Sequence, residues 1–190
     1  MTIIKKILHS LFSAFLIWQT IMLVERLLVN QPSDFSNKFL DAVFINLFVT
    51  GIFTIVYSFP VYRLLPLGYY KIKNKRLLKI CGQIIQIELF KKLLIRTIWN
   101  KKQNKKYFFS GSRNGFSDLE ITTMKSEFGH FIGFCVVMIL SIIIGIKASF
   151  LQATMILIVN IFFNFYPFML QRFHRLRLNE LKSRFRVDMV

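Results

Sequence analysis

Four long runs of apolar residues, separated by polar segments, dominate the pattern of this chain. They cover about residues 7–28, 39–62, 128–146 and 150–170. Each run is close to the roughly 20 residues that a helix needs to cross a bilayer. The pattern therefore predicts an all-α integral membrane protein with four transmembrane helices, formed as a single membrane domain over 1–190. A polar and basic region over 63–127 separates the second span from the third.

The basic region contains an amphipathic segment, from Leu77 to Trp99. Its charged and amide side chains recur every three or four positions and leave a broad apolar face. This spacing predicts a helix that lies in the cytoplasmic membrane interface, with a re-entrant segment as the alternative. Further along, Ser117 and Glu120 match a capping box, which predicts a helix start ahead of the third span.

Composition and charge agree with a membrane protein. The chain is 54% hydrophobic with 22 Phe, and its mean hydropathy is +0.50, which is too apolar for an ordinary soluble domain. Its net charge of +17 comes from 26 Lys and Arg against 9 Asp and Glu. In so apolar a chain, this charge favours anionic lipid headgroups as partners and argues against nucleic acid.

The cations are distributed unevenly between the two sides of the predicted membrane segments. Lys5 and Lys6, fifteen cations over 63–125 and six cations after Leu170 all fall on one side. The positive-inside rule therefore predicts that both termini and the central basic region are cytoplasmic.

Glu127 and His130 are the first candidates for chemistry. Their spacing of three places both side chains on one face of the third helix, near the cytoplasmic interface. A neutral imidazole accepts a proton near neutral pH, and a neighbouring carboxylate orients its ring, so the pair is a candidate general base. The alternative is structural: Glu127 pairs with Lys125 or a nearby arginine, and His130 bonds a headgroup. We predict no metal site, because a di-metal centre needs more carboxylates and the chain has only 3 His.

The fourth apolar run contributes amides to the same region. Asn160, Asn164 and Gln171 lie four and seven positions apart, which places them on one stripe of a regular helix. Because the loop at Lys147 is short, the third and fourth helices should form an antiparallel hairpin, and His130 and Asn164 then reach a similar depth. We expect these amides to bind substrate; the alternative is that they only hold the hairpin together.

A cluster of arginines follows the last span. Arg172, Arg175 and Arg177 carry guanidinium groups, which suit phosphate. They are candidate ligands for lipid headgroups or for the phosphates of an acyl donor such as acyl-CoA. A solvated flank that only meets headgroups is the alternative.

Two patches of these residues resemble a known family. The first is Lys125-Ser126-Glu127-Phe128-Gly129-His130-Phe131, and the second combines Asn164, Tyr166-Pro167 and the segment from Gln171 to Leu178. Both resemble motifs of the glycosyl-4,4'-diaponeurosporenoate acyltransferases, small membrane proteins that acylate a carotenoid glycoside.

The resemblance implies transfer of a fatty acyl group to a hydroxyl of a lipid or glycolipid acceptor. It implies Glu127 and His130 as site positions, and we expect these two residues to be catalytic. We expect acyl-CoA or a lipid as the acyl donor and no further cofactor. The resemblance implies Asn164, Gln171 and Arg172 as further site positions. From the residues themselves we also expect substrate contacts from Lys125, Asn160, Arg175 and Arg177. We expect the chain in the inner (cytoplasmic) membrane of a bacterium. The alternative function is a non-catalytic lipid-binding protein or a subunit of a membrane complex.

Overall fold

The computed structural model describes residues 3–29, 34–97 and 113–184, and these ranges are helical without a strand. Four helical segments are long and apolar enough to cross a membrane, which confirms the predicted all-helical membrane fold. They are Ile3–Val29, Phe35–Tyr57, Phe116–Lys147 and Phe150–Ser183. The second segment ends before residue 62 because Pro60 lacks the N–H that a continuing helix requires.

The chain divides into two compact units. Unit 1 comprises Met1–Tyr62 and Phe128–Pro167, and unit 2 comprises Arg63–Glu127 and Phe168–Val190. The single domain over 1–190 stays a prediction.

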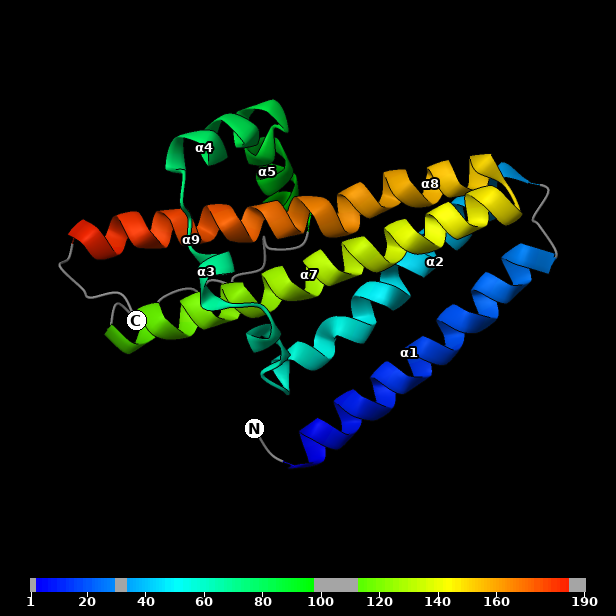
Figure 1. The fold of residues 1–190 in the computed structure, drawn as a ribbon, viewed down its shortest axis with the longest axis horizontal. Helices are drawn as coiled ribbons and strands as arrows, with labels where there is room; N and C mark the ends of the chain where they lie inside the picture. Colours follow the sequence, from blue (N-terminus) through cyan, green and yellow to red (C-terminus); the bar gives the residue numbers. More distant parts are fainter. Residues whose placement is uncertain (1–2, 30–33, 98–112, 185–190) are drawn as a thin grey trace. The chain divides into compact units, whose positions relative to one another are not determined.

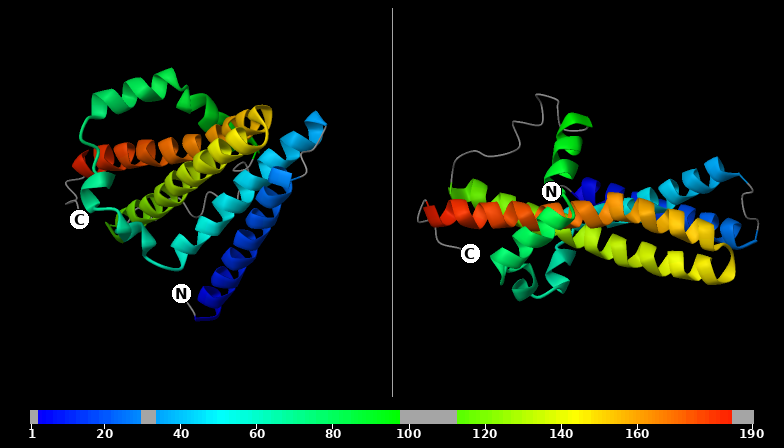
Figure 2. Two further views of the ribbon diagram at one scale, coloured as in Figure 1. Left: turned by 45° about the vertical axis from the view of Figure 1, so that its right-hand side comes forward. Right: turned by 90° about the horizontal axis from the view of Figure 1, so that it is seen from above.

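Unit 1 is built from two helical hairpins. Helix α1 (Ile3–Val29) packs against α2 (Phe35–Ile52), and α2 packs against α8 (Phe150–Asn160). The second half of α7 (Arg113–Lys147) lies antiparallel to α8 (Figures 1 and 2). The predicted turn after Lys147 is present: the Ser149 hydroxyl oxygen accepts a hydrogen bond from the Gln152 main-chain N–H at 3.3 Å and caps α8.

The core of unit 1 is narrow and aliphatic, while its outer surface remains apolar. Residues from α1, α2, α7 and α8 form the core: Leu27, Ala42, Ile45, Val49, Val137, Ile144, Met155, Ile156 and Val159. On α1, large side chains such as Phe15 and Trp18 are exposed, as expected for a helix that faces lipid. Arg26 at the end of α1 forms an ion pair with the buried Asp41 of α2, which ties this hairpin at its loop end.

Two further elements complete the central part of unit 1. A 3₁₀ segment η1 (Phe53–Tyr57) follows α2 directly, and the π-helical segment η3 (Ile161–Phe165) follows α8. A π-helical turn contains an extra residue relative to the α-helix and is frequent at functional sites.

Unit 2 contains shorter helices that lead from the second span to the third. They are the second half of η2 (Val61–Leu64), α3 (Leu67–Tyr70), α4 (Lys75–Ile84) and α5 (Ile87–Thr97). The start of α7 and most of α9 (Tyr166–Arg184) also belong to unit 2. Asn74 caps α4, because its side-chain oxygen accepts from the Leu77 main-chain N–H at 2.9 Å.

The amphipathic segment predicted over Leu77–Trp99 is not one helix. Gln86 has φ 52°, a left-handed conformation that ends α4, and α5 begins one residue later. The Ile85 N–H still bonds the Cys81 carbonyl at 3.0 Å, so the break closes the last turn of α4 rather than leaving it open. The end of the predicted helix, at Ile98 and Trp99, lies outside the described residues. The helix expected to start at Ser117 also differs, since α7 already begins at Arg113.

Gly82 allows α4 to approach α9 closely. A Cβ at this position would lie 2.0 Å from the Cζ atom of the Phe173 ring. Two other atoms of the same ring would be at 2.8 Å, so the Phe173 ring or one of the two helices must shift to admit a Cβ.

We predict that Gly82→Ala lowers the stability of the protein. Overpacking of this kind costs about 1–3 kcal/mol, which exceeds the gain of up to about 1 kcal/mol from replacing a helical glycine with alanine. Gly68→Ala is the matched control, since nothing lies within 4 Å of a Cβ there. Thermal unfolding in detergent should show a lower midpoint for G82A only. Equal midpoints for the two variants would contradict the close contact.

Candidate functional site

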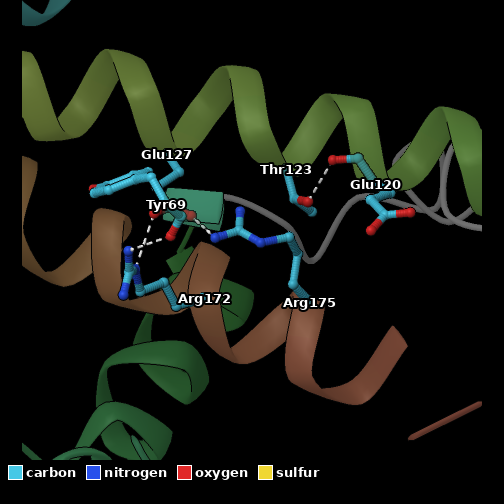
Figure 3. Close-up of polar contacts among 6 residues, drawn as sticks. All are labelled: Tyr69, Glu120, Thr123, Glu127, Arg172 and Arg175. Atoms are coloured by element: carbon cyan, nitrogen blue, oxygen red, sulfur yellow. Dashed lines mark hydrogen bonds and ion pairs between the residues drawn. The ribbon is translucent and has the colours of Figure 1, made fainter. Parts of the chain in front are cut away.

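A buried ion cluster around Glu127 lies in unit 2. The Glu127 carboxylate is fully buried, and its two oxygens accept from two arginines of α9. Arg172 Nε donates to Oε1 at 2.9 Å, and Arg175 Nη2 donates to Oε2. Figure 3 shows the carboxylate pointing from α7 toward both guanidinium groups. A carboxylate shared by two guanidinium groups leaves the cluster with a net positive charge.

Tyrosines of α3 pack on both arginines. The Arg172 guanidinium lies 4.8 Å from the centroid of the Tyr69 ring, and Arg175 lies 5.4 Å from that of Tyr70. Arg172 Nη2 also donates to the Tyr69 carbonyl at 3.2 Å. Pro66 precedes α3 in an extended conformation and starts this short helix, which brings its two rings to the arginines. Cation–π contacts and hydrogen bonds therefore fix the orientation of both guanidinium groups.

A second ion pair lies two helical turns away on the same two helices. Lys182, 2% exposed, contacts Glu120 at 2.5 Å, and the Thr123 hydroxyl donates to the Glu120 main-chain carbonyl at 2.7 Å. Glu120 and Glu127 are seven positions apart, as are Arg175 and Lys182. Seven residues are nearly two full turns, so each pair occupies one helix face. An acidic stripe of α7 therefore pairs with a basic stripe of α9.

The sequence suggested a pair of Glu127 with His130, and gave an ion pair of Glu127 with a nearby arginine as the alternative. The structure shows Glu127 paired with arginines. Arg175 is 2% exposed and its guanidinium is buried against Glu127 and Tyr70. In contrast, the Arg172 side chain is 27% exposed. Of the two arginines, Arg172 is the one that an incoming ligand can reach.

A separate network of amides occupies the interior of unit 1. Asn164 is fully buried; its Nδ2 donates to Asn160 Oδ1 at 2.9 Å and to Asn46 Oδ1 at 3.3 Å, and its Oδ1 accepts from the Thr50 hydroxyl at 2.8 Å. Asn160 donates to the Phe134 carbonyl at 3.0 Å. In an apolar interior these amides need partners, and here they satisfy one another across α2, α7, α8 and η3. Asn46 and Thr50 were not predicted as members of this group.

His130 lies at the edge of the amide network. Its ring is within hydrogen-bond reach of the Asn164 side chain and of the Phe163 main chain. Pro167 has no N–H, so the Phe163 carbonyl cannot receive the usual donor from residue 167. The His130 Nδ1 atom is buried without a hydrogen-bond partner among the described residues. A neutral imidazole that donates through one nitrogen carries a lone pair on the other.

The π-helical turn changes the register that the sequence implied. Asn160 and Asn164 stay on one face and hydrogen-bond to each other. The π-helical turn η3 interrupts the regular α-helical spacing between these amides and Gln171, which belongs to unit 2. Gln171 is half-buried on α9.

The other predicted site residues have different surroundings. Arg177 forms an ion pair with Glu88 at 2.5 Å, and both side chains are about half exposed. Lys125 is half-buried on α7, two residues before Glu127. Among the described residues, no group of three or more His, Cys, Asp or Glu is placed to hold a metal ion.

We predict that Glu127→Ala strongly destabilises the protein. Removing one partner of a buried ion pair costs about 3–5 kcal/mol because the remaining charge stays buried without compensation. Glu88→Ala is the control, since its ion pair with Arg177 is exposed and such pairs contribute at most about 1 kcal/mol. Thermal unfolding in detergent measures both. Similar midpoints for E127A and E88A would show that the Glu127 cluster is not a stabilising centre.

A glycine pair on α7 tests the amide network. A Cβ on Gly133 would lie 2.9 Å from Asn164 Oδ1, whereas a Cβ on Gly129 would meet Phe53 Cβ at an ordinary 3.5 Å. We expect Gly133→Ala to displace the Asn164 amide and to lower stability by about 1–3 kcal/mol, the cost of leaving a buried polar group unsatisfied. Gly129→Ala should leave the unfolding midpoint nearly unchanged, so a reversed order of the two midpoints would contradict this placement of Asn164.

A comparison with protein families finds a match for this chain. The model of the family described as glycosyl-4,4'-diaponeurosporenoate acyltransferase matches residues 66–184. This range contains the Glu127 cluster, the ion pair of Glu120 with Lys182, and also His130, Asn160 and Asn164. Comparison with curated proteins and with solved structures found no match. Because the family model covers more than half of the 190 residues, the chain belongs to the glycosyl-4,4'-diaponeurosporenoate acyltransferase family.

Proposed function

We propose that this protein is a membrane-embedded acyltransferase that moves a fatty acyl group onto a hydroxyl of a lipid or glycolipid acceptor. The family description supports this reaction and favours a carotenoid glycoside as the acceptor. The observation that carries the proposal is the His130 ring, whose Nδ1 is buried without a partner in the described part of the chain.

His130 is the proposed general base. Its Nδ1 takes the proton of the acceptor hydroxyl as the hydroxyl oxygen attacks the acyl carbonyl. When the tetrahedral intermediate collapses, the bond between the acyl carbon and the donor breaks, and the imidazolium returns its proton to the leaving group. The new ester bond thus replaces the bond to the donor, and the base is regenerated.

Asn164 is the proposed positioning residue for this base. It lies beside the imidazole, and its own amide is held by Asn46, Asn160 and Thr50. A base whose neighbours are fixed in this way loses little freedom when a substrate binds, which favours reaction.

The Glu127 cluster is proposed to serve the donor. Arg175 neutralises and orients the carboxylate, and Arg172, partly exposed, contacts the phosphate of an acyl donor such as acyl-CoA or a phospholipid. Glu127 is thus a positioning residue for Arg172 in this proposal. No other cofactor is required for the reaction as written.

We further propose that the protein resides in the inner membrane of a bacterium with both termini in the cytoplasm. The four membrane-length helices and the excess of cations on one side of them support this orientation. Anionic headgroups on that side are the proposed lipid partners.

His130→Ala should abolish acyl transfer while leaving protein levels normal. Without the base, the hydroxyl keeps its proton, and general-base catalysis of this kind is worth about 10²–10⁴ in rate. His9→Ala is the matched control, because His9 also lies in unit 1 but bonds Ser58 and not the amide network. Mass spectrometry of lipids from membranes that contain each variant and a supplied acyl donor measures the ester product.

Unchanged ester formation by H130A at wild-type protein levels would refute the base assignment. Absence of any ester product with the wild-type protein, together with co-purification of a stoichiometric membrane protein, would favour a non-catalytic subunit instead.

A further inference from the structure

A cavity in unit 2 opens beside Arg172. Its volume is about 830 Å³, and it lies between the segment that carries α3 and α4 and the start of α9. Small-molecule sites usually enclose about 300–1,000 Å³, so the cavity is large enough for an extended ligand.

The charged groups of this cavity are all cationic. Lys71 and Lys73, both exposed, line it together with Arg172. No acidic side chain occurs among the described residues that line it. Among the described residues, Glu127 is the carboxylate that Arg172 meets, and its two oxygens already accept from both arginines. Further N–H groups of the Arg172 guanidinium therefore remain for an anion.

The remaining wall is mostly apolar. It is formed by Ile72, Leu77, Leu78, Cys81, Phe168 and Met169. Leu77 is exposed and Leu78 is half-buried, so this wall is accessible to a ligand and is not closed core. A surface with a cationic rim and an apolar wall matches a molecule with an anionic head and a hydrocarbon chain.

We propose that this cavity binds an amphiphile with a phosphate group and a long acyl or alkyl chain. Arg172, Lys71 and Lys73 contact the phosphate, and the chain lies along Leu77, Leu78 and Phe168. The assignment rests on the proposed function, since it makes this amphiphile the acyl donor. Acyl-CoA and a phospholipid share the required chemistry.

Protection of Cys81 from alkylation tests the cavity without turnover. Cys81 is a free thiol that lines the cavity, and Cys135 in unit 1 is a free thiol that serves as internal control. The full-length protein in neutral detergent is treated with N-ethylmaleimide, and mass spectrometry quantifies both thiols. Hexadecyl phosphate should protect Cys81 and leave Cys135 unaffected. Hexadecanol and inorganic phosphate, which each lack one half of the amphiphile, should protect poorly.

Two double charge reversals make the test specific. Lys71→Glu with Lys73→Glu should raise the half-protecting concentration of hexadecyl phosphate roughly tenfold or more, because charge-assisted contacts to phosphate are lost. Lys75→Glu with Arg76→Glu changes the net charge equally on exposed positions of α4 that do not line the cavity. This control should bind within about twofold of wild type, as expected for exposed charges screened by salt.

Equal loss of protection in both double variants would overturn the assignment, as would equal protection by hexadecanol and hexadecyl phosphate.

Two further probes, the thioether hexadecyl-CoA and phosphatidylglycerol, identify the source of the phosphate. The probe that protects Cys81 at the lower concentration represents the class of the natural ligand. H130A should bind hexadecyl phosphate like wild type. If ester formation is never observed but protection depends on Lys71 and Lys73, the cavity assignment stands and the proposed reaction fails. If H130A loses acyl transfer but the two double variants behave alike, the reaction stands and this donor site fails.

Discussion

The buried carboxylate of Glu127 is the constraint on which unit 2 depends. An isolated charge in an apolar interior costs far more free energy than a small protein has in total, so the carboxylate must have partners in every folded molecule. Arg172 and Arg175 provide them, and the rings of Tyr69 and Tyr70 pack on the two guanidinium groups. One carboxylate therefore determines the placement of α3 and of the first part of α9 against α7.

The amide network of unit 1 obeys the same constraint with neutral groups. Hydrocarbon offers no hydrogen bonds, so Asn46, Asn160 and Asn164 must bond one another or the main chain. The π-helical turn and Pro167 disturb the regular bonding of the helix at this point, which leaves a carbonyl within reach of His130. The irregular backbone is thus tolerated because side chains compensate for it, and the proposed catalytic nitrogen lies beside that irregularity.

The fold was predictable from sequence because it follows from long-range averages of hydropathy. Four apolar runs and the short turn at Lys147 are sufficient to predict four helices and the α7 and α8 hairpin. Local departures were not predictable. The left-handed Gln86 splits the amphipathic segment although no glycine or proline stands there to signal a break. The π-helical turn interrupts the regular helical spacing assumed between Asn164 and Gln171, and no residue pattern announces an inserted residue in a helix.

The sequence identified several polar residues of the candidate site, but it did not identify most of the contacts between them. Asn160 and Asn164 do meet, and Glu127 was identified, but its partners are arginines because two guanidinium groups compensate a buried charge better than one imidazole does. The pairing of Glu120 with Lys182 was missed. The sequence did contain a pattern that predicts this pair. Glu120 and Glu127 are seven positions apart, and so are Arg175 and Lys182, so two antiparallel helices can pair them.

The order of the ion pairs along the chain has a consequence for biosynthesis. Glu120 and Glu127 are made before Arg175 and Lys182, and about fifty residues separate the two stripes in the sequence. A ribosome adds roughly 5–20 residues each second, so the acidic face of α7 exists for seconds without its counter-charges. During that interval water or lipid headgroups must solvate it, and unit 2 can close only after α9 has emerged. The ion pairs of unit 2 can therefore form only after α9 has been translated.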